Sequence, residues 1–134
     1  MNRVLGLLAR QRLVAAVVVG ALLLLGALLY PSLPERMAIH WNAAGQVDGT
    51  ATKPVAVLSM PAIVVVVSLL LELAGSDAGD RIVGSVAMLL LLVVQVAVFA
   101  VNLGVSVPIV PIAMAGALVV VGLAVRFERR SAGG

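Results

Sequence analysis

The polar residues best suited to chemistry lie in one segment, residues 34–53, between long apolar runs. It holds the only histidine, His40, and the only tryptophan, Trp41, with Asn42 and Asp48 close behind. Across a hairpin, Asp48 would approach His40 or Asn42 and form an acceptor-rich pocket for a metal ion, a proton or a peptide. The alternative is structural: Asn42 and Asp48 bond the backbone of a turn, while His40 packs beside Trp41. A catalytic metal site usually takes three protein ligands, so we expect no metal and no cofactor.

Within this segment the residue pattern predicts a short β-hairpin or an irregular loop. Residues 37–42 alternate with a period of two, which is typical of a strand. Residues 42–45 favour a type I turn that Gly45 closes at positive φ, and residues 46–48 form the return strand. Pro34 helps to stop the preceding helix, because proline donates no backbone N–H. An isolated hairpin is marginal in water, so we expect it to rest on the membrane surface or on the helix ends.

The composition places the chain in a lipid bilayer. Of its 134 residues, 63% are hydrophobic and 11% charged, whereas soluble domains carry about a quarter charged residues. The basic residues flank the apolar runs and form no basic stripe with aromatics, so we expect no nucleic-acid partner. The absence of cysteine excludes disulfides, iron–sulfur clusters and thiolate zinc sites.

Four long apolar runs predict an all-α membrane protein with four transmembrane helices in a single integral domain, residues 1–134. The predicted helices cover about 13–30, 54–74, 82–103 and 106–125, and the connecting loop covers 31–53. The first run, at roughly 1.5 Å per residue, is just long enough to cross. Its alternative is a secretory signal peptide, but the run is long for one and no A-x-A site follows Leu29.

Polar residues at the ends of the runs predict where helices begin. Thr52, just before a proline, is the expected N-cap of the second span, and Asp80 that of the third. Ser106 followed by Pro108 predicts the start of the fourth span. Residues 131–134 are expected to fray as a terminal tail.

The basic residues at the connections predict the orientation. Seven lie on the side that the two termini share: Arg3, Arg10, Arg12, Arg81, Arg126, Arg129 and Arg130. The other side has Arg36 and Lys53. Because short cytoplasmic connections carry the excess of positive charge, the termini are expected in the cytoplasm, the loop 31–53 outside, and the protein in the cytoplasmic membrane.

Two neutral amides fall inside the third span, Gln95 near its middle and Asn102 near its outer end. Polar groups there need partners, so both should face the interior of the bundle. They either line a polar path or bond neighbouring helices, and neutral amides favour the second interpretation. Glu72, at the inner end of the second span, is expected to pair with Arg81 or with the N-terminal arginines.

Enzyme signatures are missing from the sequence. There is no HExxH, no G-x-S-x-G and no P-loop, and no serine is placed with the lone histidine and an acid. We therefore expect a protein that is not an enzyme.

The polar segment also carries an ordered motif. Leu33-Pro34, Ile39-His40-Trp41-Asn42, Gly45 and Asp48-Gly49 follow one another between the first two spans. This order resembles the "LP…I-H-(aromatic)-N-x-x-G-x-x-D" loop of a small membrane domain of unknown function, the N-terminal part of the SdpI-type immunity proteins. The resemblance covers roughly the first half of the chain, from the first span into the second.

The resemblance implies a multi-spanning protein of the cytoplasmic membrane. Founding members of the family protect a cell from a toxic secreted peptide and take part in signalling to a transcriptional repressor. The family pattern falls on Pro34, His40, Asn42, Gly45 and Asp48. SdpI-type proteins continue into a further set of membrane helices, whereas about two more follow here.

Two functions remain open from the sequence. In the first, the protein is non-enzymatic and its external loop recognises an extracellular peptide or another membrane protein. In the second, it is a small transporter or channel-like subunit that forms a homo-oligomer, with Gln95 and Asn102 lining a path. Variants of His40 or Asp48 would disable the first function, and Gln95→Leu the second.

Overall fold

The computed structural model describes residues 2–133, and its order of elements confirms the predicted architecture. In chain order the elements are α1 (Arg3–Leu8), α2 (Gln11–Leu29), the 3₁₀ turn η1 (Tyr30–Ser32), β1 (Arg36–Trp41), β2 (Val47–Thr52), α3 (Lys53–Leu73), α4 (Ala78–Asn102) and α5 (Ile109–Gly133). Four of the helices, α2 to α5, are long and apolar enough to cross a bilayer. The protein is therefore a multi-pass membrane protein whose helices contact lipid, with a two-stranded antiparallel hairpin between the first two spans.

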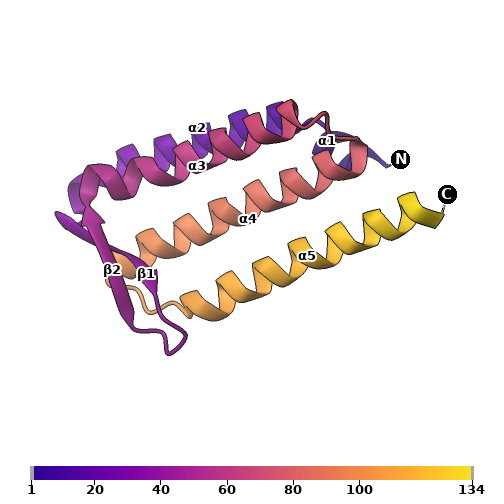
Figure 1. Cartoon of the computed structure of the whole chain (residues 1–134). Helices are drawn as coiled ribbons and strands as arrows, with labels where there is room; N and C mark the ends of the chain where they lie inside the picture. Colours follow the sequence, from indigo (N-terminus) through magenta and orange to yellow (C-terminus); the bar gives the residue numbers. More distant parts are fainter. Residues whose placement is uncertain (1, 134) are drawn as a thin grey trace.

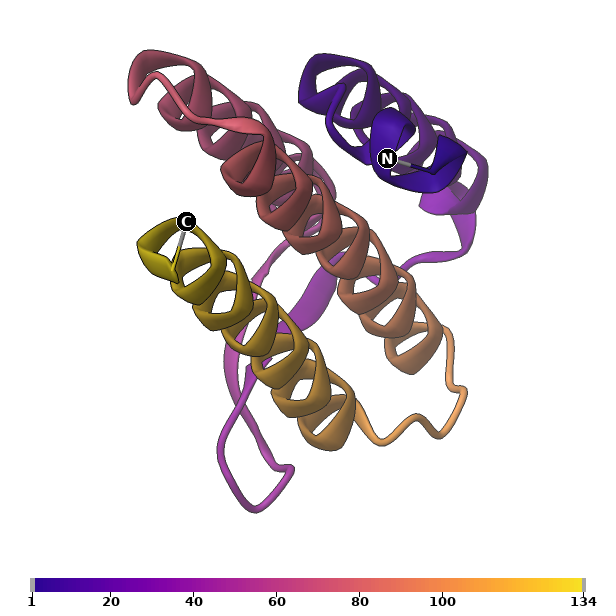
Figure 2. The same cartoon turned by 90° about the vertical axis from the view of Figure 1, so that its right-hand side faces the viewer.

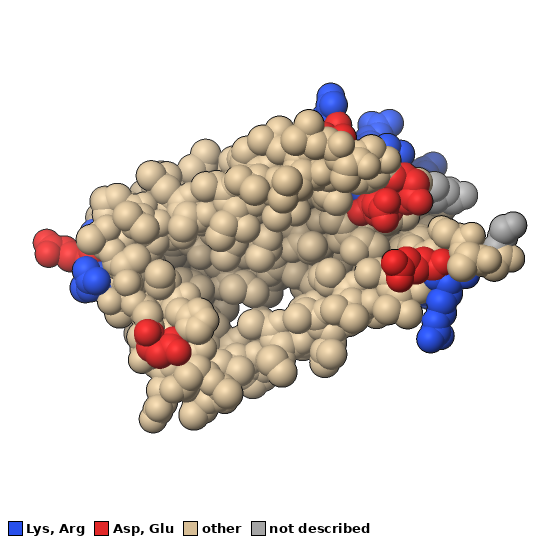
Figure 3. Space-filling view, in the orientation of Figure 1, with Lys and Arg blue, Asp and Glu red and all other residues tan. Residues whose placement is uncertain are grey.

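The helices lie nearly parallel, with both termini at one end and the hairpin at the other (Figures 1 and 2). α2, α3 and α4 all pack against one another, whereas α5 packs along α4. α2 and α5 thus lie on opposite sides of α4 (Figure 2). On the face shown in Figure 3, charged side chains gather at the two ends and none lies over the middle, as expected of a protein that spans lipid.

α4 begins earlier than predicted because Asp77, rather than Asp80, is its N-cap. A carboxylate oxygen of Asp77 accepts from the backbone N–H of Asp80 at 2.9 Å, and the Asp80 carboxylate accepts from the Asp77 N–H at 3.3 Å. This reciprocal capping box satisfies two N–H groups at the helix start, so the helix starts at Ala78. Thr52 does occupy the N-cap position of α3, but its side chain makes no capping hydrogen bond.

The bounds of α5 also correct the prediction. Ser106 lies in the irregular connection between α4 and α5 and not at the start of a helix, because α5 starts at Ile109. At the other end the helix continues to Gly133, past the expected end at residue 125 and through most of the expected tail. Arginine, glutamate and alanine are good helix formers, so the polar end continues the helix beyond the apolar run. Gly134 lies outside the described residues.

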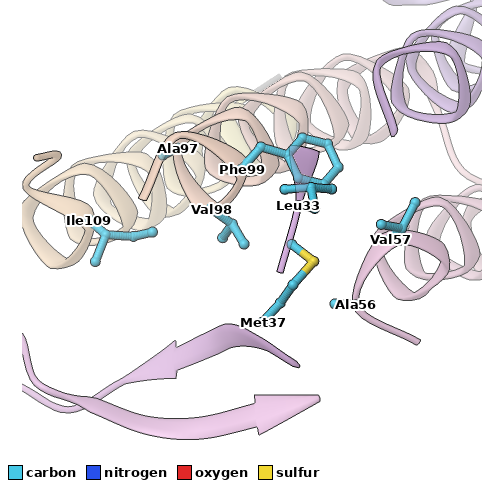
Figure 4. Packing of buried hydrophobic residues seen from close by; sticks show 8 residues of the cluster. All are labelled: Leu33, Met37, Ala56, Val57, Ala97, Val98, Phe99 and Ile109. Carbon is cyan, nitrogen blue, oxygen red and sulfur yellow. The ribbon is translucent and has the colours of Figure 1, made fainter. Parts of the chain in front are cut away.

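Two apolar clusters hold the bundle together. One, in the middle of the helices, comprises the buried residues Ala15, Val18, Leu22, Val64 and Met88. The other lies at the hairpin end and comprises Leu33, Met37, Ala56, Val57, Ala97, Val98, Phe99 and Ile109 (Figure 4). α2 and α3 come especially close at Gly26, where a Cβ would lie 2.7 Å from Cγ1 of Val57. A larger residue there would force the stiff valine out of place.

The hairpin is irregular in a way that the alternating pattern did not predict. A regular strand would put Met37, Ile39 and Trp41 on one face. Instead the register shifts on both sides of His40, which pairs with Gly49. Ile39 in β1 and Asp48 in β2 are thereby left out of register, as in a β-bulge.

Charged and amide side chains tie the opposite end of the bundle together. Glu72 accepts from Nε2 of Gln11 at 2.6 Å and from a guanidinium nitrogen of Arg12 at 2.7 Å. Gln11 is 2% exposed, whereas the Arg12 side chain is 81% exposed. The sequence predicted an ion pair of Glu72 with Arg81 or an N-terminal arginine, and Arg12 is the partner.

The Glu72–Gln11 and Glu72–Arg12 bonds should contribute very differently to the thermal stability of the protein. Glu72→Leu leaves the buried Gln11 amide without a partner and is expected to lower the thermal stability of the detergent-solubilised protein clearly. Arg12→Leu removes only a water-exposed ion pair and should change it little. Circular dichroism melts of both variants check the order, and equal melting temperatures would contradict it.

Candidate functional site

The hairpin is fixed to the bundle by the side chain of Met37, which is fully buried. It points from β1 into the space between Leu33 and Phe99 on one side and Ala56 on the other (Figure 4). A flexible thioether fills such an irregular space well. Met37 therefore serves as an apolar anchor for the strand that carries His40.

Asn102, the last residue of α4, holds the same strand by hydrogen bonds. Its Oδ1 accepts from the backbone N–H of Ala38 at 2.9 Å, and its Nδ2 donates to the Ala38 carbonyl at 2.9 Å. Nδ2 also donates to the Val98 carbonyl one helical turn back, at 2.8 Å. The amide thus serves both backbone groups of Ala38, as a neighbouring strand would.

Lys53 fixes the far end of the hairpin. Its ammonium donates to the carbonyl of Tyr30 at 3.0 Å and lies 4.6 Å from the centroid of the Tyr30 ring, a cation–π contact. Its backbone N–H donates to the Glu35 carbonyl at 2.8 Å. The two ends of the hairpin are therefore joined where the chain leaves α2 and enters α3.

His40 and Asp48 form the polar centre of the hairpin. Nδ1 of His40 lies 2.5 Å from Oδ1 of Asp48, and the two side chains are 71% and 43% exposed. Gly49 makes room for this pair, because a Cβ at that position would lie 3.0 Å from Cβ of His40. The out-of-register Asp48 can then turn its carboxylate toward the imidazole. Of the two partners expected for Asp48, the structure joins it to His40.

Asn42 has a different role from its two neighbours in the motif. Its Oδ1 accepts from the backbone N–H groups of Ala44 and Gln46, each at 3.0 Å, and its Nδ2 donates to Oε1 of Gln46 at 3.2 Å. These bonds close the turn, which Gly45 completes at a φ of 79° as predicted. Asn42 therefore stabilises the turn and does not join His40 and Asp48.

The remaining motif residues lie around this centre. Trp41 is half-buried and packs against the cluster at the hairpin end. With Gly45 it also lines an open cleft of about 330 Å³, and residues of the connection before α5 line the other side of this cleft. Pro34 is exposed and lies in the short link between η1 and β1.

Beneath the hairpin lies a larger groove of about 780 Å³. Ile39, His40 and Trp41 belong to its roof, and apolar side chains of α3, α4 and α5 form its walls. Gln95, 3% exposed, belongs to its lining, and its Nε2 donates to the Ala56 carbonyl of α3 at 3.3 Å. The sequence did not indicate this groove. Its walls come from three different helices, and in the sequence their apolar residues cannot be told apart from residues that face lipid.

The described residues, 2–133, hold no group of three or more histidine, aspartate or glutamate side chains that would bind a metal ion. His40 and Asp48 form a hydrogen-bonded pair in this region. The pair presents an imidazole and a carboxylate to whatever approaches the hairpin.

Comparison with known families recovers the same segment. Residues 17–65 match the family model of a domain of unknown function, DUF1648. The DUF1648 match spans most of α2, the whole hairpin and the first half of α3, and thus includes His40 and Asp48. Gln95 and Asn102 lie beyond it. Neither the curated proteins nor the solved structures contain a significant match to the chain.

Proposed function

We propose that this protein is a non-enzymatic membrane receptor whose hairpin recognises a peptide outside the cell. Seven basic residues lie on the side of the termini, which favours termini in the cytoplasm and a hairpin outside. His40 and Asp48 then face the medium at the membrane surface, where a secreted peptide arrives.

The observation that carries this proposal is the rigid attachment of an exposed polar pair. Met37, Asn102 and Lys53 hold the hairpin at three points, while the side chains of His40 and Asp48 remain accessible. A pre-formed surface loses little conformational entropy when a ligand binds, which favours recognition. Exposed functional groups on a connection held by a rigid scaffold are the common arrangement of binding sites.

The resemblance to SdpI-type proteins supports a finer proposal. The recognised peptide would be a toxic secreted one, and the outcome would be protection of the cell, with signalling to a transcriptional repressor. The DUF1648 match includes the motif that this resemblance rests on.

The proposal is tested by binding in lipid nanodiscs. The immobilised protein is exposed to the peptide fraction of the medium in which its own cells grow, and retained peptides are identified by mass spectrometry. Wild-type protein is expected to retain peptides that empty nanodiscs do not. His40→Ala and Asp48→Ala should each reduce that retention at least about tenfold, the effect of losing one charge-assisted hydrogen bond.

Gln46→Ala is the matched control, because Gln46 lies on the same hairpin, is exposed, and bonds only within the turn. It should retain peptides as the wild type does. Retention unchanged in both His40→Ala and Asp48→Ala, or no retention above empty nanodiscs, would refute the proposed function.

Transport by an oligomer receives less support from the contacts. The Asn102 side chain is committed to Ala38 and Val98, so it is not available to a passing solute. Gln95 alone would have to line the path.

A further inference from the structure

A pocket of about 330 Å³ lies at the end of the bundle that holds both termini, opposite the hairpin (Figure 1). Its lining comes from the start of α2, the end of α3 and the first turn of α4. Two apolar spans meet polar residues here, because the span of α2 begins at Gln11 and that of α3 ends at Leu73. The pocket therefore lies at the level where the hydrocarbon core of the bilayer gives way to the headgroups.

The lining of this arginine pocket carries an excess of positive charge. It includes Arg10 just before α2, Arg12 in the first turn of α2, and Arg81 in the first turn of α4. Glu72 is the one acidic residue of the lining, and Gln11 and Arg12 use both of its carboxylate oxygens. Within residues 2–133 neither Arg10 nor Arg81 forms an ion pair. Two positive charges are thus in excess, and the pocket is complementary to an anion.

Two polar atoms of the same lining are buried without a partner. They are Oε1 of Gln11 and Nε of Arg81, and in residues 2–133 no other buried side-chain atom lacks a hydrogen bond. The one hydrogen bond of the Arg81 guanidinium is a long one, 3.4 Å from a terminal nitrogen to the Ser76 carbonyl. A guanidinium that is partly removed from water without a countercharge is destabilising. An anion beside Arg81 would offset that cost.

The start of α2 adds backbone donors to the pocket. Arg10 occupies the N-cap position, and no side chain caps the helix. The first N–H groups of a helix have no intrahelical partner, and together with the positive end of the helix dipole they favour a phosphate. In α2 these groups belong to Gln11, Arg12 and Leu13, all of which line the pocket.

The surroundings of the pocket favour a lipid phosphate over a phosphate dissolved in water. From Leu13 a row of exposed apolar side chains continues along α2 through Val17 and Leu24. Their spacing of four and seven residues puts them on one side of the helix, where they face lipid. Because Leu13 also lines the pocket, a phospholipid with its phosphate there would lay an acyl chain along this row. A free phosphate would gain nothing from it.

We propose that the arginine pocket binds the phosphate of an anionic phospholipid in the leaflet on the side of the termini. Arg10 and Arg81 supply the charge, the start of α2 supplies N–H groups, and Leu13 makes the first contact with the acyl chain. Basic pockets between membrane helices are a common form of headgroup site. The site is independent of recognition at the hairpin, since it lies at the opposite end of the spans.

Native mass spectrometry of the detergent-solubilised protein tests the proposal by titration with two lipids. Dioleoyl phosphatidylglycerol and dioleoyl phosphatidylcholine share the phosphate and the acyl chains, but only the first has a net negative charge. The wild type is expected to bind phosphatidylglycerol at least about fivefold more tightly, the effect of one basic contact near a charged headgroup. Arg10→Gln and Arg81→Gln should each weaken phosphatidylglycerol binding about fivefold and leave phosphatidylcholine binding nearly unchanged.

Two further variants separate a specific site from general attraction and from a structural effect. Arg3→Gln removes the same charge from the same end, but Arg3 does not line the pocket, so its binding should equal that of the wild type. Glu72→Gln removes the negative charge of the lining while its amide oxygen can still accept from Gln11. It should tighten phosphatidylglycerol binding, whereas damage to the bundle would weaken it.

Three outcomes would overturn the proposal: equal binding of both lipids by the wild type, equal losses in Arg3→Gln and Arg10→Gln, or weaker binding in Glu72→Gln. Glycerol phosphate, which has the anion without acyl chains, identifies the source of the phosphate. It is expected to displace phosphatidylglycerol only at far higher concentrations than a competing lipid does. Displacement at equal concentrations would show a site for soluble anions instead. His40→Ala should leave all these results unchanged, so the proposal stands or falls separately from peptide recognition.

Discussion

Met37→Ala is expected to destabilise the hairpin end of the protein by about 2–5 kcal/mol, the range found when a buried methionine or leucine is truncated. Met37 is fully buried between Leu33, Ala56 and Phe99, and alanine would leave a cavity that three different elements line. Because β1 is held by Asn102 at Ala38 and by the backbone of Lys53 at Glu35, it cannot slide inward and the cavity should collapse poorly. Hydrogen exchange of the β1 amides in nanodiscs measures the loss, as does the midpoint of thermal unfolding in detergent.

Met114→Ala is the matched control, since Met114 is 61% exposed on α5 and belongs to neither of the two buried clusters. It should leave both measurements close to those of the wild type. If Met37→Ala exchanges no faster than Met114→Ala, then the methionine does not anchor the hairpin. The role of His40 and Asp48 as a pre-formed pair would then lose its basis.

Much of the fold could be predicted because the bilayer restricts the choice. A spanning segment must satisfy its backbone internally, so run length and polarity are nearly enough to locate helices. The turn could also be predicted from the sequence. The Asn42 side chain bonds the backbone of its own turn, and Gly45 adopts the positive φ that the turn needs. The start of α4 could not be predicted in this way, because both Asp77 and Asp80 can cap a helix. The geometry of their two hydrogen bonds shows that Asp77 is the N-cap.

The site was predictable only in part, because its geometry depends on distant contacts. That Asp48 would meet His40 or Asn42 followed from the hairpin. That it meets His40 follows from two register shifts, which Gly49 accommodates on β2. The groove escaped prediction entirely. It exists because α5 follows α4 instead of closing over α3, and no local pattern in α5 encodes that choice.

Asn102→Leu is expected to release β1 from α4 and to expose the strand to exchange. Leucine nearly preserves volume but offers no partner to the N–H and carbonyl of Ala38, which is half-buried. Each backbone group left unpaired in such a place costs about 1–3 kcal/mol, less where water can reach it. With about 1.4 kcal/mol for each factor of ten, the Ala38 amide should exchange at least about tenfold faster. Gln46→Leu, which removes an exposed amide of the turn, should leave the Ala38 amide protected.

The double variant Met37→Ala with Asn102→Leu tests whether both side chains stabilise the same element, the strand β1. Met37 belongs to β1, and Asn102 bonds the next residue of the strand, Ala38, so either substitution alone should loosen the same strand. The second substitution then has less left to disrupt, and the double variant should lose clearly less stability than the sum of the single losses. Strict additivity would mean that the apolar anchor and the amide hold separate parts of the hairpin.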